Sequence, residues 1–156
     1  MIKILDGDVV YADADIIAHQ VNCRGTMGAG LAKQIKFFFP EAFNAYESLC
    51  KQHRYDPDEL LGNCQLVMST KPNDDRVIIA NLFAQDRYGR DRRFTDYDAF
   101  RQCMVALNRK AKSIYAKTIA LPYKIGCGLA GGDWDKIYNI IENELAGFDV
   151  KLYRIK

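Results

Sequence analysis

The stretch from residue 16 to residue 39 constrains this chain most, because an apolar strand, a glycine-rich loop and a helix follow one another directly. The apolar run leads into polar residues, and the loop then reads Arg24-Gly25-Thr26-Met27-Gly28-Ala29-Gly30. The helical pattern after it keeps its apolar residues on one side. A loop of this kind presents free backbone N–H groups at the positive end of a helix, which suits a phosphate group. The sequence therefore predicts that this loop carries the function.

A second glycine-rich loop has the same context. A short predicted strand stops at Pro122, and the loop that follows reads Ile125-Gly126-Cys127-Gly128-Leu129-Ala130-Gly131-Gly132. In a parallel sheet both loops lie at the carboxyl ends of strands, where ligands bind. Neither is a P-loop or a Rossmann loop, because the required lysine and glycine spacings are missing. A lone glycine-rich loop is often only a tight turn, but two that face each other suit a diphosphate.

The rest of the chain predicts about six strands interleaved with four helices. The nearly continuous apolar run over 77–84 is typical of a central strand that is buried on both faces. Thr95-x-x-Asp98 resembles a capping box at the start of the longest helix, and 56–58 is predicted to be a loop. The interleaving favours an α/β fold, a three-layer α/β/α sandwich with a mixed, largely parallel sheet. We expect one domain over residues 1–156.

Charge and cysteine content exclude several classes of protein. Lys and Arg total 22 against 20 acidic residues, so the net charge of +2 gives no strong attraction to nucleic acid or membrane. The five cysteines are far apart and form no Cys-x-x-Cys pair, and two histidines do not complete a zinc site. No signal segment or membrane span is evident. We expect a cytoplasmic monomer with reduced thiols and without a metal, a cofactor or a membrane partner.

Taken together, these motifs resemble the macro domain, the ADP-ribose-binding family, over essentially the whole chain. The similarity rests on Gly7-Asp8, on the strand to Asn22 with Met27-Gly28-Ala29-Gly30-Leu31-Ala32, and on Leu121-Pro122 with the second glycine-rich loop. The chain is more similar to the branch of the terminal ADP-ribose protein glycohydrolase and the ADP-ribose 1''-phosphate phosphatases than to the branch with an Asn-Ala-Ala-Asn motif. The resemblance implies the macro domain fold and ADP-ribose or a derivative of it as the partner.

The resemblance also implies roles for particular residues. Asp8, with Val9 beside it, matches the aspartate that accepts a hydrogen bond from the adenine amino group; the alternative is plain turn chemistry. Asn22 matches the polar position that faces the distal ribose, where an amide both donates and accepts. The two loops match the segments that hold the diphosphate and the distal ribose, namely Thr26, Met27, Gly28, Ala29, Gly30, Ile125, Gly126, Cys127, Gly128 and Leu129.

Departures from the glycohydrolase pattern shape the expected activity. The resemblance implies a lysine nucleophile after the 77–84 strand, but the loop there reads Ala84-Gln85-Asp86, and Ala130 stands where an aspartate would follow the second motif. We therefore expect hydrolysis of ADP-ribose 1''-phosphate without a lysine. The predicted catalytic residues are Asn22, His19 and Asp133. A structural histidine and a helix cap are the alternatives for the last two.

Other functions stay open at this point. A non-catalytic ADP-ribose reader would share every loop residue. A lysine-independent hydrolase would cleave ADP-ribosyl esters of protein or nucleic acid, or O-acetyl-ADP-ribose. Tyr88 lies among Arg87, Arg90, Arg92 and Arg93, which either bind nucleic acid or form an ordinary solvated loop. Phe83 and Tyr153, near strand ends, are candidates for ring contacts with a ligand. Cys127 is interpreted as a small loop residue and not as a nucleophile.

Overall fold

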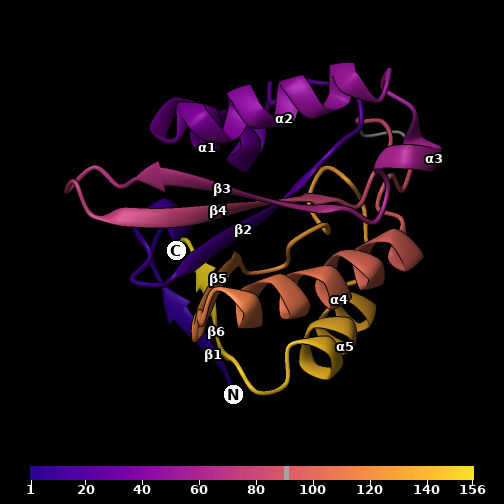
Figure 1. Cartoon of the computed structure of the whole chain (residues 1–156). Helices are drawn as coiled ribbons and strands as arrows, with labels where there is room; N and C mark the ends of the chain where they lie inside the picture. Colours follow the sequence, from indigo (N-terminus) through magenta and orange to yellow (C-terminus); the bar gives the residue numbers. More distant parts are fainter. Residues whose placement is uncertain (90–91) are drawn as a thin grey trace.

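The computed structural model describes residues 1–89 and 92–156, and in this part a six-stranded sheet lies between two layers of helices (Figure 1). The elements are β1 (Ile2–Asp6), the 3-10 helix η1 (Val9–Tyr11), β2 (Ile16–Val21), α1 (Gly30–Phe38), α2 (Pro40–Gln52), α3 (Pro57–Leu60), β3 (Cys64–Thr70), β4 (Arg76–Phe83), α4 (Tyr97–Ser113), β5 (Thr118–Pro122), α5 (Trp134–Glu144) and β6 (Asp149–Arg154). The strand order is β1-β6-β5-β2-β4-β3, and among these described strands only β3 pairs antiparallel to its neighbour. The predicted sandwich with a largely parallel sheet is confirmed.

Two apolar cores hold the layers together. Figure 1 shows α1 and α2 on one face of the sheet and α4 and α5 on the other. Successive side chains of a strand alternate between faces, so Ile17 of β2 packs into the first core and Ile16 and Ala18 into the second. The apolar run of β4 is confirmed as a strand inside the sheet, between β2 and β3.

Helix starts differ from the predictions at two places. The prediction of a capping box at Thr95 is wrong, because Asp96 caps α4 by accepting a hydrogen bond from the N–H of Ala99 (2.9 Å). Thr95 therefore precedes the helix, and its hydroxyl bonds elsewhere. The predicted loop at 56–58 contains the start of α3, because Asp56 caps it and Pro57 is preorganised for the first helical position.

Both glycine-rich loops leave the sheet at the same edge. They follow β2 and β5, which are neighbours and pair in parallel with Ile16 beside Ile119. The polar end of β2 and the end of β5 therefore point the same way, as the sequence predicts. The fold brings together two loops that lie about a hundred residues apart in the chain.

Candidate functional site

Two cavities at this edge join into one cleft. The proximal cavity, of about 750 Å³, extends from Asp8 to Ile155, and the distal cavity, of about 820 Å³, extends from Asn22 to the second glycine-rich loop. The residues that line both are Gly30, Leu31, Pro122, Tyr123 and Lys124. An elongated ligand can therefore run from one cavity into the other between the two glycine-rich loops.

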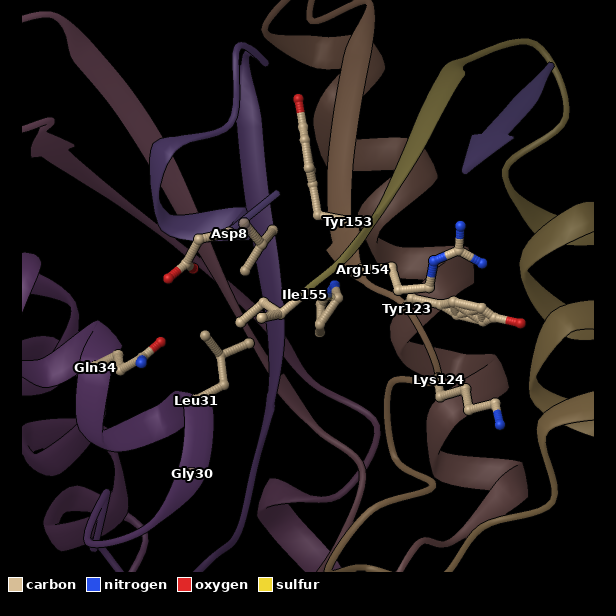
Figure 2. Close-up of a pocket in the computed structure, with 11 residues that line it drawn as sticks. Asp8, Gly30, Leu31, Gln34, Tyr123, Lys124, Tyr153, Arg154 and Ile155 are labelled. Atoms are coloured by element: carbon tan, nitrogen blue, oxygen red, sulfur yellow. The ribbon is translucent and has the colours of Figure 1, made fainter. Parts of the chain in front are cut away.

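Asp8 marks the proximal end of the cleft. Its Oδ1 accepts a hydrogen bond from the N–H of Val10 (3.1 Å), so the carboxylate caps η1 and also lines the cavity together with Val9. Figure 2 shows Asp8 on one side of the cavity and Tyr123 and Arg154 on the other. This position agrees with both interpretations of Asp8 from the sequence, namely that it stabilises a turn and that it contacts a ligand.

The two aromatic candidates differ in where they lie. Tyr153 is among the residues that line the proximal cavity, and its ring contact with a ligand stays a prediction. Phe83 is fully buried, with its ring centroid 5.6 Å from that of Tyr46. The prediction of a ligand contact at Phe83 is wrong, because the end of β4 packs under α2 and does not open into the cleft.

The first glycine-rich loop presents the open end of α1 to the cleft. Thr26, Gly28, Ala29 and Gly30 line the distal cavity, whereas the side chain of Met27 is buried in the core beneath the loop. The N-cap residue Ala29 makes no side-chain cap hydrogen bond. The first N–H groups of a helix lack intrahelical partners, so this helix end offers donors and positive potential to a ligand.

The second glycine-rich loop forms the opposite wall. Ile125, Gly126, Gly128 and Leu129 line the distal cavity, with Ile125 anchored in the core. Cys127 is not among the residues that line it. Burial raises the pKa of the Cys127 thiol to about 11, so at neutral pH it is protonated and a poor nucleophile.

Asn22 is held from several sides at the distal end. Its Oδ1 accepts hydrogen bonds from the Tyr46 hydroxyl (2.6 Å) and the N–H of Arg24 (2.8 Å), and its Nδ2 donates to the carbonyl of Thr26 (3.0 Å). These bonds fix which end of the amide is the oxygen and how it faces the cavity. Asn22 is therefore a preorganised polar group.

Tyr46, which the sequence does not mark as a site residue, is hydrogen-bonded to Asn22. It lies on α2 and is fully buried. Burial raises the pKa of the phenol, which stays protonated and donates to Asn22. A buried hydroxyl needs a hydrogen-bond partner, so a tyrosine among the apolar residues of a helix was the one signal in the sequence for this contact.

His19 is buried, at 1% exposure, and is also among the residues that line the distal cavity. Its Nε2 donates to Oδ1 of Asn81 (2.6 Å) on β4, and the Asn81 amide in turn donates to the carbonyl of Ala42 (3.1 Å) on α2. Burial lowers the pKa of His19 to about 4, so the imidazole is neutral at pH 7. The bond to Asn81 fits the structural alternative, the place in the distal cavity fits the catalytic one, and the catalytic role of His19 stays a prediction.

Asp133 lies at the start of α5. Its Oδ1 accepts a hydrogen bond from the N–H of Asp135 (2.9 Å), which is the cap that the sequence offered as an alternative. It is not among the residues that line either cavity. The structure therefore does not bring Asp133 together with Asn22, and its catalytic role stays a prediction.

The segment after β4 borders the distal cavity. Gln85, Tyr88 and Gly89 line it, and Asp86 forms an ion pair with Arg24 of the first loop. The arginine cluster of the sequence analysis is thus next to the cleft, with Arg90 outside the described residues. Within the described residues, no group of three His, Cys, Asp or Glu side chains could hold a metal ion, and no helix is long and apolar enough to cross a membrane.

Comparison with known proteins gives the family. The model of the Macro domain family matches residues 18–141. The chain belongs to the macro domain family. This macro domain is 35% identical over 102 residues to an ADP-ribose 1''-phosphate phosphatase of Debaryomyces hansenii. The aligned region covers 58% of this chain and 57% of that protein.

Other similar proteins come from Mycobacterium tuberculosis. A DNA ADP-ribosyl glycohydrolase is 30% identical over 137 residues, which is 88% of this chain and 36% of that protein. The solved macrodomain of DarG from the same organism superposes with a TM-score of 0.82 at 27% identity, covering 98% of this chain and 97% of that one. This macro domain therefore spans only part of the length of these curated relatives, about half in the first case and a third in the second.

Proposed function

We propose that this macro domain binds ADP-ribose along the cleft and hydrolyses a derivative of it, with ADP-ribose 1''-phosphate as the leading substrate. The observation that carries the proposal is the continuity of the two cavities, which join the Asp8 carboxylate to the fixed Asn22 amide past both glycine-rich loops. ADP-ribose has its parts in the matching order, with a nucleoside first, a diphosphate in the middle and a second ribose at the far end. The named activity of the Debaryomyces relative supports the choice of substrate.

Each part of the ligand has a counterpart in the cleft. The adenosine occupies the proximal cavity, where Asp8 accepts from the adenine amino group and Tyr153 contacts the ring system. The diphosphate lies at the open N-terminal end of α1, where helix dipole and free N–H groups favour an anion. The distal ribose and its phosphate lie between Asn22 and the second loop.

Hydrolysis by this site uses water directly. No lysine stands in the segment 84–86 after β4, where the resemblance to the glycohydrolase implies the nucleophile, so the proposed route has no covalent sugar–lysine intermediate. Water attacks the terminal phosphorus and loses one proton to solvent as the P–O bond to the ribose oxygen breaks. That oxygen takes a proton from solvent and leaves as a hydroxyl group, so inorganic phosphate and ADP-ribose are the products. Asn22 and the loop N–H groups orient the phosphate and stabilise its charge.

The test is phosphate release from ADP-ribose 1''-phosphate. Asn22→Ala removes the amide that faces the distal cavity, so we expect release to fall by about a hundredfold or more, as when an oriented donor is lost. Asn139→Ala, at an exposed position of α5, is the matched control and should release phosphate like the wild type. Unchanged release by Asn22→Ala would contradict the assignment of this residue. Release below detection by the wild type, with tight ADP-ribose binding, would instead identify a reader.

A second candidate is hydrolysis of ADP-ribose attached to nucleic acid or, as an ester, to protein. The specific observation in its favour is that Tyr88 and Gly89, beside the arginine-rich segment, line the distal cavity, where a bulky attachment would emerge. The Mycobacterium relative is named for DNA as its substrate. Release of ADP-ribose from modified DNA, with a steep dependence on salt, would favour this candidate over the phosphatase.

We further propose that residues 1–156 act as one cytoplasmic macro domain and as a monomer. All five cysteines are free thiols, and four of them are buried, as in proteins of reducing compartments. Sedimentation of the purified chain tests the monomer, and fractionation of cells that express it tests the compartment.

A further inference from the structure

Thr95 lies beneath the second glycine-rich loop, where its buried hydroxyl joins two separate parts of the distal site. Its Oγ1 donates to the carbonyl of Gly126 (2.7 Å) and accepts from Nε2 of Gln20 (2.9 Å) on β2. Its side chain is 1% exposed, and it is not among the residues that line the cleft. The hydroxyl that the sequence pattern assigned to a helix cap is therefore engaged with the loop.

The backbone around Thr95 is bound to the same loop. The N–H groups of Phe94 (2.7 Å) and Thr95 (3.2 Å) both donate to the carbonyl of Ala130. Gln20 also donates to Oε1 of Gln85 (2.7 Å), and both of these glutamines line the distal cavity. A continuous set of hydrogen bonds thus runs from β2 and the end of β4 through Thr95 to the loop.

The bond to Gly126 fixes one peptide unit of the loop. The Gly126 carbonyl accepts from the Thr95 hydroxyl and from the N–H of Gly132 (2.8 Å). The N–H of Cys127, on the same peptide unit, donates to the backbone carbonyl of Lys124 (3.0 Å). Because a peptide unit is planar, these bonds hold it at both ends. Gly126 and the nearby Gly128, which both line the distal cavity, are then held in one arrangement.

The packing here leaves little room for an alternative arrangement. Gly126 has φ of +76°, and a Cβ at this position would lie 2.9 Å from Oε1 of Gln20 and 3.2 Å from Oγ1 of Thr95. Glycine is thus needed both for the backbone conformation and for the close approach of the polar side chains. The loop and the side chains below it form one unit.

We propose that Thr95 is a positioning residue that gives this macro domain its selectivity for ADP-ribose over AMP. The inference rests on the proposed function, because the distal ribose is the part of the ligand that meets the second loop. Loss of the hydroxyl removes one of the three hydrogen bonds that hold the Gly126 peptide, and weakens only the contacts that AMP does not make. The proximal cavity, with Asp8, Tyr153 and Ile155, is left as it is.

The experiment compares Thr95→Val, which has the same shape without the hydroxyl, with Thr95→Ser, which keeps it. Isothermal titration should show ADP-ribose binding weakened about tenfold in Thr95→Val, which corresponds to a typical net hydrogen bond, with AMP affinity unchanged. Thr95→Ser should bind both ligands like the wild type. Equal weakening of both ligands, or no weakening, would overturn the proposal.

A second measurement needs no ligand. Amide hydrogen exchange should be faster over residues 126–132 in Thr95→Val than in the wild type and Thr95→Ser, with α4 unchanged. Unchanged exchange in this segment would contradict the positioning role even if affinity fell. A wild type that binds neither ligand would contradict the proposed function instead, and the exchange result would still decide whether Thr95 holds the loop.

Discussion

The two ends of the cleft are built in different ways. At the proximal end a single carboxylate, Asp8, lies among side chains of η1, α1 and β6, and its only protein hydrogen bond in the described structure is to the backbone of η1. At the distal end Asn22 and Gln20 are each bonded to other buried or half-buried groups. The proximal end is suited to recognition by shape and one hydrogen bond, and the distal end to polar groups that are fixed before the ligand arrives.

Asp8→Ala should have the largest effect on binding. A hydrogen bond to a charged group is worth about 1.5–3 kcal/mol, so we expect a loss of affinity of about tenfold to a hundredfold. Because ADP-ribose and AMP share the adenine, both should weaken equally in isothermal titration. Weakening of ADP-ribose alone would contradict the assignment of adenine to the proximal end.

The stability of Asp8→Ala must be measured beside its affinity. Loss of the cap on η1 should cost about 1 kcal/mol in urea unfolding. Asp8→Asn keeps an oxygen that can cap and should regain most of that stability. A binding loss in a variant of normal stability would then be due to the ligand contact.

Tyr46→Phe should weaken binding at the distal end of the cleft and leave binding at the proximal end unchanged. The change leaves the ring packing intact but removes the donor to Asn22, so urea unfolding should show a loss of about 1–3 kcal/mol. Affinity for ADP-ribose should fall several-fold and affinity for AMP should not change. Tyr138→Phe, on α5, is the matched control. A distal site that binds normally without the Tyr46 hydroxyl would refute its preorganisation.

His19 should make stability depend on pH. Its folded-state pKa of about 4 lies below the ordinary value of 6.5, so the unfolded chain takes up a proton first as pH falls. The contribution of neutral His19 to the free energy of unfolding is complete above pH 6.5. It is lost progressively as the pH falls from 6.5 to 4, with the free energy decreasing by about 1.4 kcal/mol per pH unit. His19→Gln should flatten the slope in unfolding experiments between pH 6.5 and 4.5. An identical slope in both proteins would show that His19 is not the group responsible.

Asp133 should have the smallest effect on the cleft. If it only caps α5, Asp133→Ala lowers stability by about 1 kcal/mol and Asp133→Asn keeps it, with phosphate release unchanged in both. Thermal unfolding and the phosphate assay check this. Loss of release in Asp133→Asn at normal stability would instead establish the catalytic role predicted from the sequence.

The sequence predicts those parts of the fold that depend on local pattern. Apolar runs located the strands, and the two glycine-rich loops came out at one edge because β2 and β5 are neighbours. The polar partners were not predictable, because the bond from Tyr46 to Asn22 spans 24 residues and that from Gln20 to Thr95 spans 75. Thr95 and Asp96 are both good caps, and only the packed loop decides between them.

Isothermal titration of the wild type with ADP-ribose and AMP, with ADP as a third ligand, tests most directly whether the cleft binds ADP-ribose. We predict that ADP-ribose binds about tenfold or more tightly than AMP, since only ADP-ribose extends into the distal cavity. Equal affinity for ADP-ribose and AMP would mean that the distal cavity takes no part in binding. The absence of binding to all three would contradict the proposal that this cleft is an ADP-ribose site.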